Sequence, residues 1–224
     1  MGCPMPKIAN SGDGCGLMRT PELAGEIVKA VVSAVDVPVT VKCRLGWDKG
    51  NINVLDFTKR MEDCGASMVA VHGRTRAMLY SGTADWDYIR KVKEQLSIPV
   101  IANGDIVDPA SALRCLKWTG ADGIMIGRAT FGDPWIFQQV SAAMAGEEIP
   151  ERPILKDRIA VAVKQFELSE ADHGEKIACL EARKHFAWYL RGVRNASFYK
   201  KEISSMNTME DIYRIAKEIV RDLE

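Results

Sequence analysis

Four short apolar runs in the chain each end in polar or glycine residues. Unbroken apolar runs of this length are typical of parallel strands that are buried on both faces. The runs occupy residues 39–42, 68–74, 100–105 and 123–128. The predicted strands therefore end near Lys42, His72, Asn103 and Gly127.

Segments with helical start and stop signals separate these runs. Pro21 stands at a first helical position, and Asn53 and Asp56 have the spacing of a capping box. The predicted helices cover residues 20–35, 53–65, 85–96, 108–120 and 133–146. Alternating strands and helices with short crossovers predict parallel neighbouring strands, as in a (β/α) barrel.

Strand signals stop after a linker at residues 147–153. Helical periodicity continues over residues 154–173, 176–194 and 208–223, and Thr208 and Asp211 have the spacing of a capping box. We therefore expect a partial barrel domain at residues 1–146 and a separate, small all-helical domain at residues 154–224.

Charge and cysteine content restrict the class of protein. Lys plus Arg and Asp plus Glu are balanced at 30 each, so a polyanion can be bound only through a local basic patch. The six cysteines are scattered without a CxxC pair, which favours reduced thiols. We expect a cytoplasmic protein without a metal site, a membrane span or a signal peptide.

The predicted strand ends carry candidate ligand-binding residues. Lys42 ends an otherwise apolar run, where an unpaired buried ammonium is expensive; a salt-bridged structural lysine is the alternative. His72 is followed by Arg74 and Arg76, which suits an anionic or heteroaromatic ligand, although a lone histidine is more often a core residue.

A phosphate site is predicted at the last two strand ends. Asn103-Gly104-Asp105 and Gly127-Arg128 occupy the positions at which barrel loops supply such sites, because glycine permits close approach and arginine is a bidentate donor. Asn-Gly-Asp alone is also a good turn sequence.

The glycine-rich segment Gly12–Gly16 lacks the third glycine of a dinucleotide fingerprint and follows no complete strand. We interpret it as a flexible loop, so a nicotinamide cofactor would have to dock at the barrel mouth.

The second predicted helix of the helical domain is rich in cations with aromatic residues between them. Arg183, Lys184 and Arg191 are candidates for phosphate contacts, and positions 184 and 191 would share a face of one helix. The alternative is an ordinary solvated face.

Together these motifs resemble those of the tRNA-dihydrouridine synthases, most closely the bacterial branch. The resemblance covers essentially the whole chain. It is carried by residues 2–7, 11–14, 39–47, 72–76, 80–82, 84–86, 103–105, 126–128 and 183–190.

The resemblance implies an FMN enzyme in which NADPH reduces the flavin and hydride passes to C6 of a uracil base in tRNA. Cys3 would give the proton to C5, which agrees with the need for an acid opposite the hydride. Lys42 would contact the isoalloxazine and His72 would lie beside it. Asn103–Asp105 with Gly127 and Arg128 would hold the FMN phosphate. Arg74 and the cations Arg183, Lys184 and Arg191 would contact tRNA.

The chain departs from the family at its start, because a complete member has eight strands and four are found here. The expected fold is thus the carboxyl-terminal half of a (β/α)8 TIM barrel followed by the helical domain. Open strand edges favour self-association and weak flavin binding. The alternatives are a flavin barrel that acts on a free pyrimidine or another small molecule, and an inactive RNA-binding fragment. Flavin absorbance separates the last of these from the enzymes.

Overall fold

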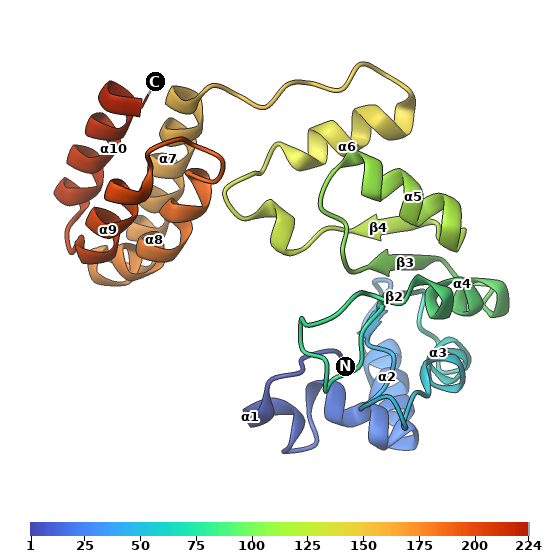
Figure 1. The fold of residues 1–224 in the computed structure, drawn as a ribbon. Coiled ribbons are helices and arrows are strands. Elements are labelled where there is room, and N and C mark those ends of the chain that lie inside the picture. Colours follow the sequence, from blue (N-terminus) through green and yellow to red (C-terminus); the bar gives the residue numbers. More distant parts are fainter. Residues whose placement is uncertain (224) are drawn as a thin grey trace. The chain divides into compact units, whose positions relative to one another are not determined.

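A four-stranded parallel sheet forms the centre of the first half of the chain in the computed structural model, which describes residues 1–223 (Figure 1). The strands are β1 (Thr40–Cys43), β2 (Met68–His72), β3 (Val100–Asn103) and β4 (Gly123–Met125). They pair in chain order, with each strand parallel to the next. The predicted α/β fold with a parallel sheet is confirmed.

Helices lie in each crossover between strands and before β1. Neighbouring helices pack on one another in the order α2, α3, α4 and α5. Their apolar faces bury Phe57, Met61, Ile89 and Cys115 completely. The elements are α1 (Pro6–Ala9), the 3-10 helix η1 (Gly14–Arg19), α2 (Pro21–Ala34), α3 (Val54–Asp63), α4 (Trp86–Gln95) and α5 (Pro109–Thr119).

One side of α2 remains apolar and exposed. Leu23, Ile27 and Val31 follow one another at intervals of four residues and are 39–48% exposed. Val35, at the carboxyl end of the helix, is also exposed. We call these four residues the α2 stripe.

Most of the predicted helix caps are present. Asp108 and Ser111 form a capping box on α5, and Gly120 ends this helix in the left-handed conformation. The capping box predicted at Asn53 is wrong, because its side chain does not cap α3. The Asn53 amide instead donates a hydrogen bond of 2.7 Å to the carbonyl of Met18.

The contacts divide the chain into two compact units, residues 1–127 and 128–224. The second unit is helical, and its core includes Phe166, Phe186, Ile203 and Ile212. Its elements are η2 (Arg128–Thr130), α6 (Ile136–Ala145), α7 (Leu155–His173), α8 (Glu175–Tyr189), α9 (Ser197–Ser205) and α10 (Met209–Leu223).

The predicted capping box of α10 is confirmed by two reciprocal bonds of 3.2 Å between Thr208 and Asp211. The helix predicted at residues 176–194 ends earlier, at Tyr189, and α9 follows as a separate element. This shortening changes which cations share a helical face.

The division into units precedes the linker predicted at residues 147–153, because the segment after β4 packs on α8. The ring of Phe131 lies 5.6 Å from those of His185 and Trp188. A Cβ atom on Gly132 would lie 2.3 Å from the backbone of Trp188, so this approach requires glycine. Within residues 1–223, no helix combines the length and the apolar character that crossing a membrane requires.

Candidate active site

Hydrogen bonds connect the carboxyl ends of three strands. Lys42 Nζ on β1 donates to Asn103 Oδ1 on β3 at 3.0 Å. The Asn103 Nδ2 group donates to the carbonyl of Met125 on β4 at 2.7 Å. The Asn103 amide is thereby fixed with its oxygen toward the lysine. Part of the Lys42 side chain is exposed, yet desolvation by the surrounding protein lowers the pKa of its ammonium group.

His72 ends β2 opposite Asn103 and is neutral at physiological pH. Its pKa is lowered to about 3, first by burial and then by the positive charges of Arg44, Lys42 and Arg74. Arg74 Nη1 lies 3.3 Å from His72 Nε2. Because a guanidinium only donates, Nε2 is the acceptor and the ring proton is on Nδ1.

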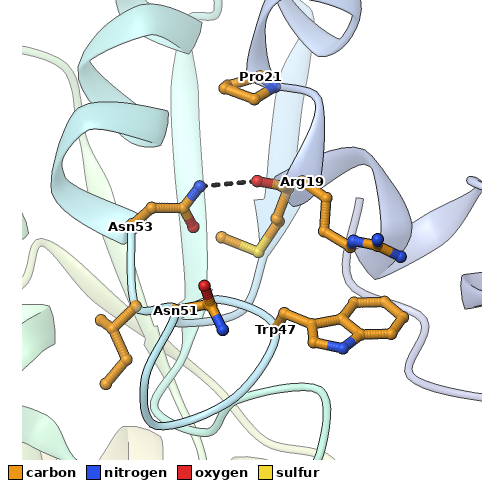
Figure 2. A pocket seen from close by; sticks show the side chains of 7 residues that line it. Arg19, Pro21, Trp47, Asn51 and Asn53 are labelled. Carbon is orange, nitrogen blue, oxygen red and sulfur yellow. Dashed lines mark hydrogen bonds between the residues drawn. The ribbon is translucent and has the colours of Figure 1, made fainter.

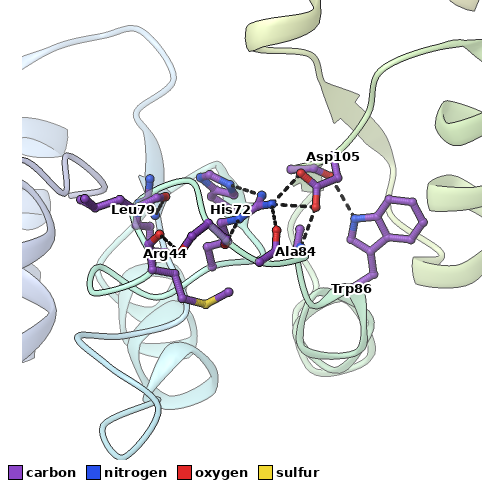
Figure 3. Close-up of polar contacts among 11 residues, drawn as sticks. Arg44, His72, Leu79, Ala84, Trp86 and Asp105 are labelled. Carbon is purple, nitrogen blue, oxygen red and sulfur yellow. Dashed lines mark hydrogen bonds and ion pairs between the residues drawn. The ribbon is translucent and has the colours of Figure 1, made fainter.

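Arg74 is a structural residue of this site rather than a surface cation. The residue is 2% exposed, and its Nη2 atom lies 2.7 and 2.8 Å from the two carboxylate oxygens of Asp105 (Figure 3). It also donates to the carbonyls of Ser81 and Gly82. Asp105 in turn accepts from the backbone N–H of Ala84 at 2.7 Å. These bonds leave Arg74 little contact with solvent, and its predicted tRNA contact stays a prediction.

The Asn103-Gly104-Asp105 segment is a tightly packed turn. Gly104 has φ of 117° and Asp105 has φ of 56°. A Cβ atom on Gly104 would lie 2.8 Å from Ala84 Cβ and 2.9 Å from the His72 ring, so only glycine fits. The Gly104 carbonyl accepts from the indole N–H of Trp86 at 3.0 Å. The turn therefore sets the position of the His72 ring.

Gly127 and Arg128 follow β4, and both are exposed. They stand on the two sides of the division between the units. Their predicted contribution to a phosphate site stays a prediction.

Cys3 is exposed, and its backbone is held on both sides. Arg44 Nε donates to the carbonyl of Gly2 at 3.1 Å, and the N–H of Cys15 donates to the carbonyl of Cys3 at 3.0 Å. A Cβ atom on Gly14, which has φ of +54°, would lie 2.8 Å from Cys3 Cβ. The segment Gly12–Gly16 was predicted to be a flexible loop, which is wrong for the part that enters η1. Its glycines permit close packing on Cys3 and Ala9.

Arg44 is a site residue that the sequence reasoning missed. It is 2% exposed and donates to the carbonyls of Thr75 and Leu79 at 3.0 and 2.7 Å (Figure 3). It thus joins the Cys3 segment to the segment that follows β2. The signal was its position two residues after Lys42, just beyond the apolar run, since alternate residues of a strand share a face.

The cations predicted to bind RNA in the helical unit have different surroundings. Arg183 is committed to the α9–α10 connection, where it donates to the Met206 carbonyl at 2.8 Å and to Asn207 Oδ1 at 2.6 Å. Lys184 is exposed on α8. Arg191 lies beyond the end of α8 with its guanidinium 4.4 Å from the Trp188 ring centre. The prediction that positions 184 and 191 share one helical face is therefore wrong.

No group of three or more His, Cys, Asp or Glu residues that could hold a metal ion occurs among residues 1–223. The strand edge instead offers an ammonium group, a neutral imidazole and an oriented amide. This donor set suits a planar ligand with hydrogen-bond acceptors and developing negative charge.

The chain is similar to known proteins over most of its length. The family profile described as "Dihydrouridine synthase (Dus)" matches residues 1–223. A "Probable tRNA-dihydrouridine synthase 1" from Synechocystis sp. is 42% identical over 94% of this chain and 59% of its own length. A "tRNA-dihydrouridine synthase B" from Vibrio cholerae is 44% identical over 94% of this chain and 65% of its own length.

A "Probable tRNA-dihydrouridine synthase" from Rickettsia conorii is 41% identical over 92% of this chain and 62% of its own length. The chain thus spans about three fifths of the length of these curated relatives. A solved mandelate oxidase mutant covers 88% of the chain with a TM-score of 0.31 and 14% identity, which is too low to support an inference. The sequence motifs and the family match agree: the chain belongs to the dihydrouridine synthase family.

Proposed function

We propose that this chain belongs to an FMN- and NADPH-dependent enzyme that reduces uridine to 5,6-dihydrouridine in tRNA. The proposal combines family membership with one observation: Lys42, neutral His72 and Asn103 meet at the strand edge, and Arg44 joins that edge to the Cys3 segment. The four strands would then be half of a (β/α)8 barrel, in a cytoplasmic protein.

The strand-edge residues fit the flavin that the family resemblance implies. FMN, when bound, supplies hydride transfer between the nicotinamide and the substrate. Lys42 would contact the ring and stabilise negative charge on it, with its ammonium group held by the Asn103 amide. His72 would donate from Nδ1, because Arg74 occupies Nε2. Asn103–Asp105, Gly127 and Arg128 would hold the phosphate.

Cys3 is the proposed acid that protonates C5 of the base. Its thiol is exposed, so a base can reach it, whereas Cys15 and Cys43 are buried. Burial also raises the pKa of the Cys43 thiol to about 12. The bonds to the backbone of Gly2 and Cys3 would hold the Sγ atom in place while the base, rather than the loop, moves.

The helical unit is proposed to make most of the contacts to tRNA. The chain has no net charge, so phosphate contacts must come from local cations such as Lys184 and Arg191. A base must leave its stack to meet a flavin, and folded RNA must be held while this happens.

The test is Cys3→Ala in the full-length protein, with Cys64→Ala as the matched control. Cys3→Ala should keep NADPH-dependent bleaching of the flavin and lower the rate of uridine reduction in tRNA by about 10²–10⁴-fold. Cys64→Ala should leave both rates unchanged. Full tRNA turnover by Cys3→Ala would assign the acid to another residue. Equal turnover of free uridine would favour the small-molecule alternative.

A further inference from the structure

A pocket of about 630 Å³ lies in the first unit and is lined by none of the strand-edge residues (Figure 2). Its walls come from the end of η1 and from the loop between β1 and α3. We call it the Trp47 pocket, and its lining residues are Met18, Arg19, Pro21, Trp47, Asn51, Ile52 and Asn53. The volume lies within the range of small-ligand sites.

The position of Trp47 is fixed by the backbone of its loop. Gly46 pairs with Ile52 across the loop, and the N–H of Trp47 donates to the carbonyl of Asn51 at 3.1 Å. A Cβ atom on Gly46 would lie 2.1 Å from that carbonyl oxygen, so glycine is required. The Trp47 carbonyl accepts from Ala77 at 2.9 Å. The backbone that carries the indole is therefore held in place, which lowers the entropic cost of binding.

Two arginines lie over the indole ring of Trp47. The guanidinium carbon is 4.8 Å from the ring centre in Arg19 and 4.6 Å in Arg76. Across residues 1–223, neither arginine forms an ion pair with a carboxylate. The buried Nε of Arg76 has no hydrogen-bond partner. A stacked guanidinium keeps its N–H donors in its own plane, where a phosphate can meet those that remain free; in Arg76, Nη2 already donates to Asn10 Oδ1 at 3.0 Å.

Two side-chain amides supply acceptors in the same pocket. Asn53 Oδ1 is buried without a hydrogen-bond partner, while its amide nitrogen is held by Met18. The Asn51 nitrogen is held by Asp48 at 2.8 Å. Figure 2 shows both amide oxygens turned toward the space between the labelled residues. A buried acceptor without a partner calls for a donor, and the amino and imino groups of a nucleobase are such donors.

We propose that the Trp47 pocket binds one nucleotide of the RNA substrate outside the reacting position. Its base would stack on the Trp47–arginine surface and donate to the Asn51 and Asn53 oxygens, while Arg19 and Arg76 contact phosphates. The inference rests on the proposed tRNA substrate. A free nucleotide has the same chemistry, but two cations at one ring suit the two phosphates that flank a base in a strand.

The pocket also shares an element with the Cys3 segment. Cys15, which binds the Cys3 carbonyl, and Arg19, which lines the pocket, both belong to η1. A nucleotide held at the pocket would therefore rest on the same short helix that positions the proposed acid.

The test measures the affinity of the chain for a labelled tRNA transcript by fluorescence anisotropy over a salt series. Trp47→Ala should weaken binding roughly tenfold, and Trp47→Phe, which keeps a stacking ring, should retain most of the affinity. Arg19→Ala should lower the slope of log affinity against log salt by about 0.7. The control is Arg114→Ala, which removes an equal charge from an exposed position on α5 and should change neither quantity.

Competition identifies the source of the nucleotide. A single-stranded RNA oligomer should displace the transcript less effectively from the Trp47→Ala variant than from the wild type. AMP should displace it from neither. Displacement by AMP from the wild type but not from Trp47→Ala would assign the pocket to a free nucleotide and overturn the RNA assignment. Equal affinities for Arg19→Ala and Arg114→Ala would overturn the inference even if Trp47→Ala failed to fold, because Arg19 is exposed.

The test of the Trp47 pocket can fail independently of the test of the proposed function. If the full-length protein reduces uridine in tRNA and the pocket variants bind like the control, the pocket inference alone fails. If the full-length protein reduces no uridine, the proposed function fails whatever the anisotropy shows.

Discussion

The strand edge of the first unit and the region around the end of α8 both concentrate positive charge, but they use it differently. Arg44 and Arg74 are buried, and their guanidinium groups bind backbone carbonyls and one carboxylate. Lys184 and Arg191 are exposed. A buried, multiply bonded arginine fixes the positions of loops, whereas an exposed cation contributes mainly long-range attraction. Cationic residues near a proposed RNA-binding enzyme's site are therefore not all RNA contacts.

The largest expected effect is on the Arg74–Asp105 pair. Arg74→Met should lower the free energy of unfolding by about 3–5 kcal/mol, because it leaves a partly buried carboxylate and several carbonyls without their partner. The control is Arg90→Met, whose exposed pair with Asp87 should contribute less than about 1 kcal/mol. Urea unfolding followed by circular dichroism measures both. Equal losses would contradict the distinction between buried and exposed arginines.

Substitutions at two glycines with positive φ distinguish the cost of backbone strain from the cost of a steric clash. Gly104→Ala should cost about 2–4 kcal/mol, since the new methyl group meets Ala84 and His72 in addition to the backbone strain. Gly120 has φ of +65° but open space around it. Gly120→Ala should therefore cost only the backbone strain, about 1–2 kcal/mol of stability. Thermal unfolding of the two variants gives the difference. A cost for Gly120→Ala as large as that for Gly104→Ala would show that packing at the turn is unimportant.

Buried His72 makes the free energy of unfolding depend on pH. Its folded pKa of about 3 lies below the usual value of 6.5, so the unfolded chain binds the extra proton first as the pH falls. The stabilisation that results from this lowered pKa is complete above pH 6.5 and is lost progressively toward pH 3. Lowering the pH from 7 to 5 should thus cost the wild type about 2 kcal/mol through this residue.

His72→Gln should remove most of that difference between pH 7 and 5, as measured by urea unfolding at both pH values. His173→Gln is the control, because His173 is half exposed. A wild type whose stability is the same at pH 7 and 5 would show that His72 is not neutral in the folded state.

The smallest effect on stability is expected at the exposed cations. Lys184→Ala with Arg191→Ala should change the free energy of unfolding by less than about 0.5 kcal/mol. The same double variant should lower the log–log salt slope of tRNA binding by about 0.7–0.9 per lost phosphate contact. Arg183→Ala should lower the free energy of unfolding and leave the salt slope unchanged, because Arg183 stabilises the α9–α10 connection. An unchanged slope in the double variant would move the proposed RNA interface away from the end of α8.

The sequence predicted what depends on local rules. Strand ends near Lys42, His72 and Asn103 follow from apolar runs, and the α5 and α10 caps follow from short-range hydrogen bonding. Prediction from the sequence failed where a residue distant in the sequence determines the contacts of a side chain. Asn53 caps nothing because Met18 takes its amide, and nothing near Arg74 in sequence indicates that Asp105 covers it.

The glycine-rich segment near Cys3 illustrates a second kind of failure. Glycines indicate flexibility when they are considered alone, but Gly14 and Gly16 are required here by close approach to Cys3 and Ala9. Close approach depends on three-dimensional packing, which has no signature in a single sequence.

The α2 stripe and the exposed cations respond to salt in opposite directions. Apolar burial strengthens on warming and in sulfate or phosphate, so association of chains through Leu23, Ile27, Val31 and Val35 would grow under those conditions. Attraction between cations and RNA weakens as ionic strength rises. Raising the ionic strength with sulfate or phosphate would therefore suppress nonspecific RNA binding but favour association through the α2 stripe, whereas a cold, chloride-containing buffer would suppress the first without favouring the second.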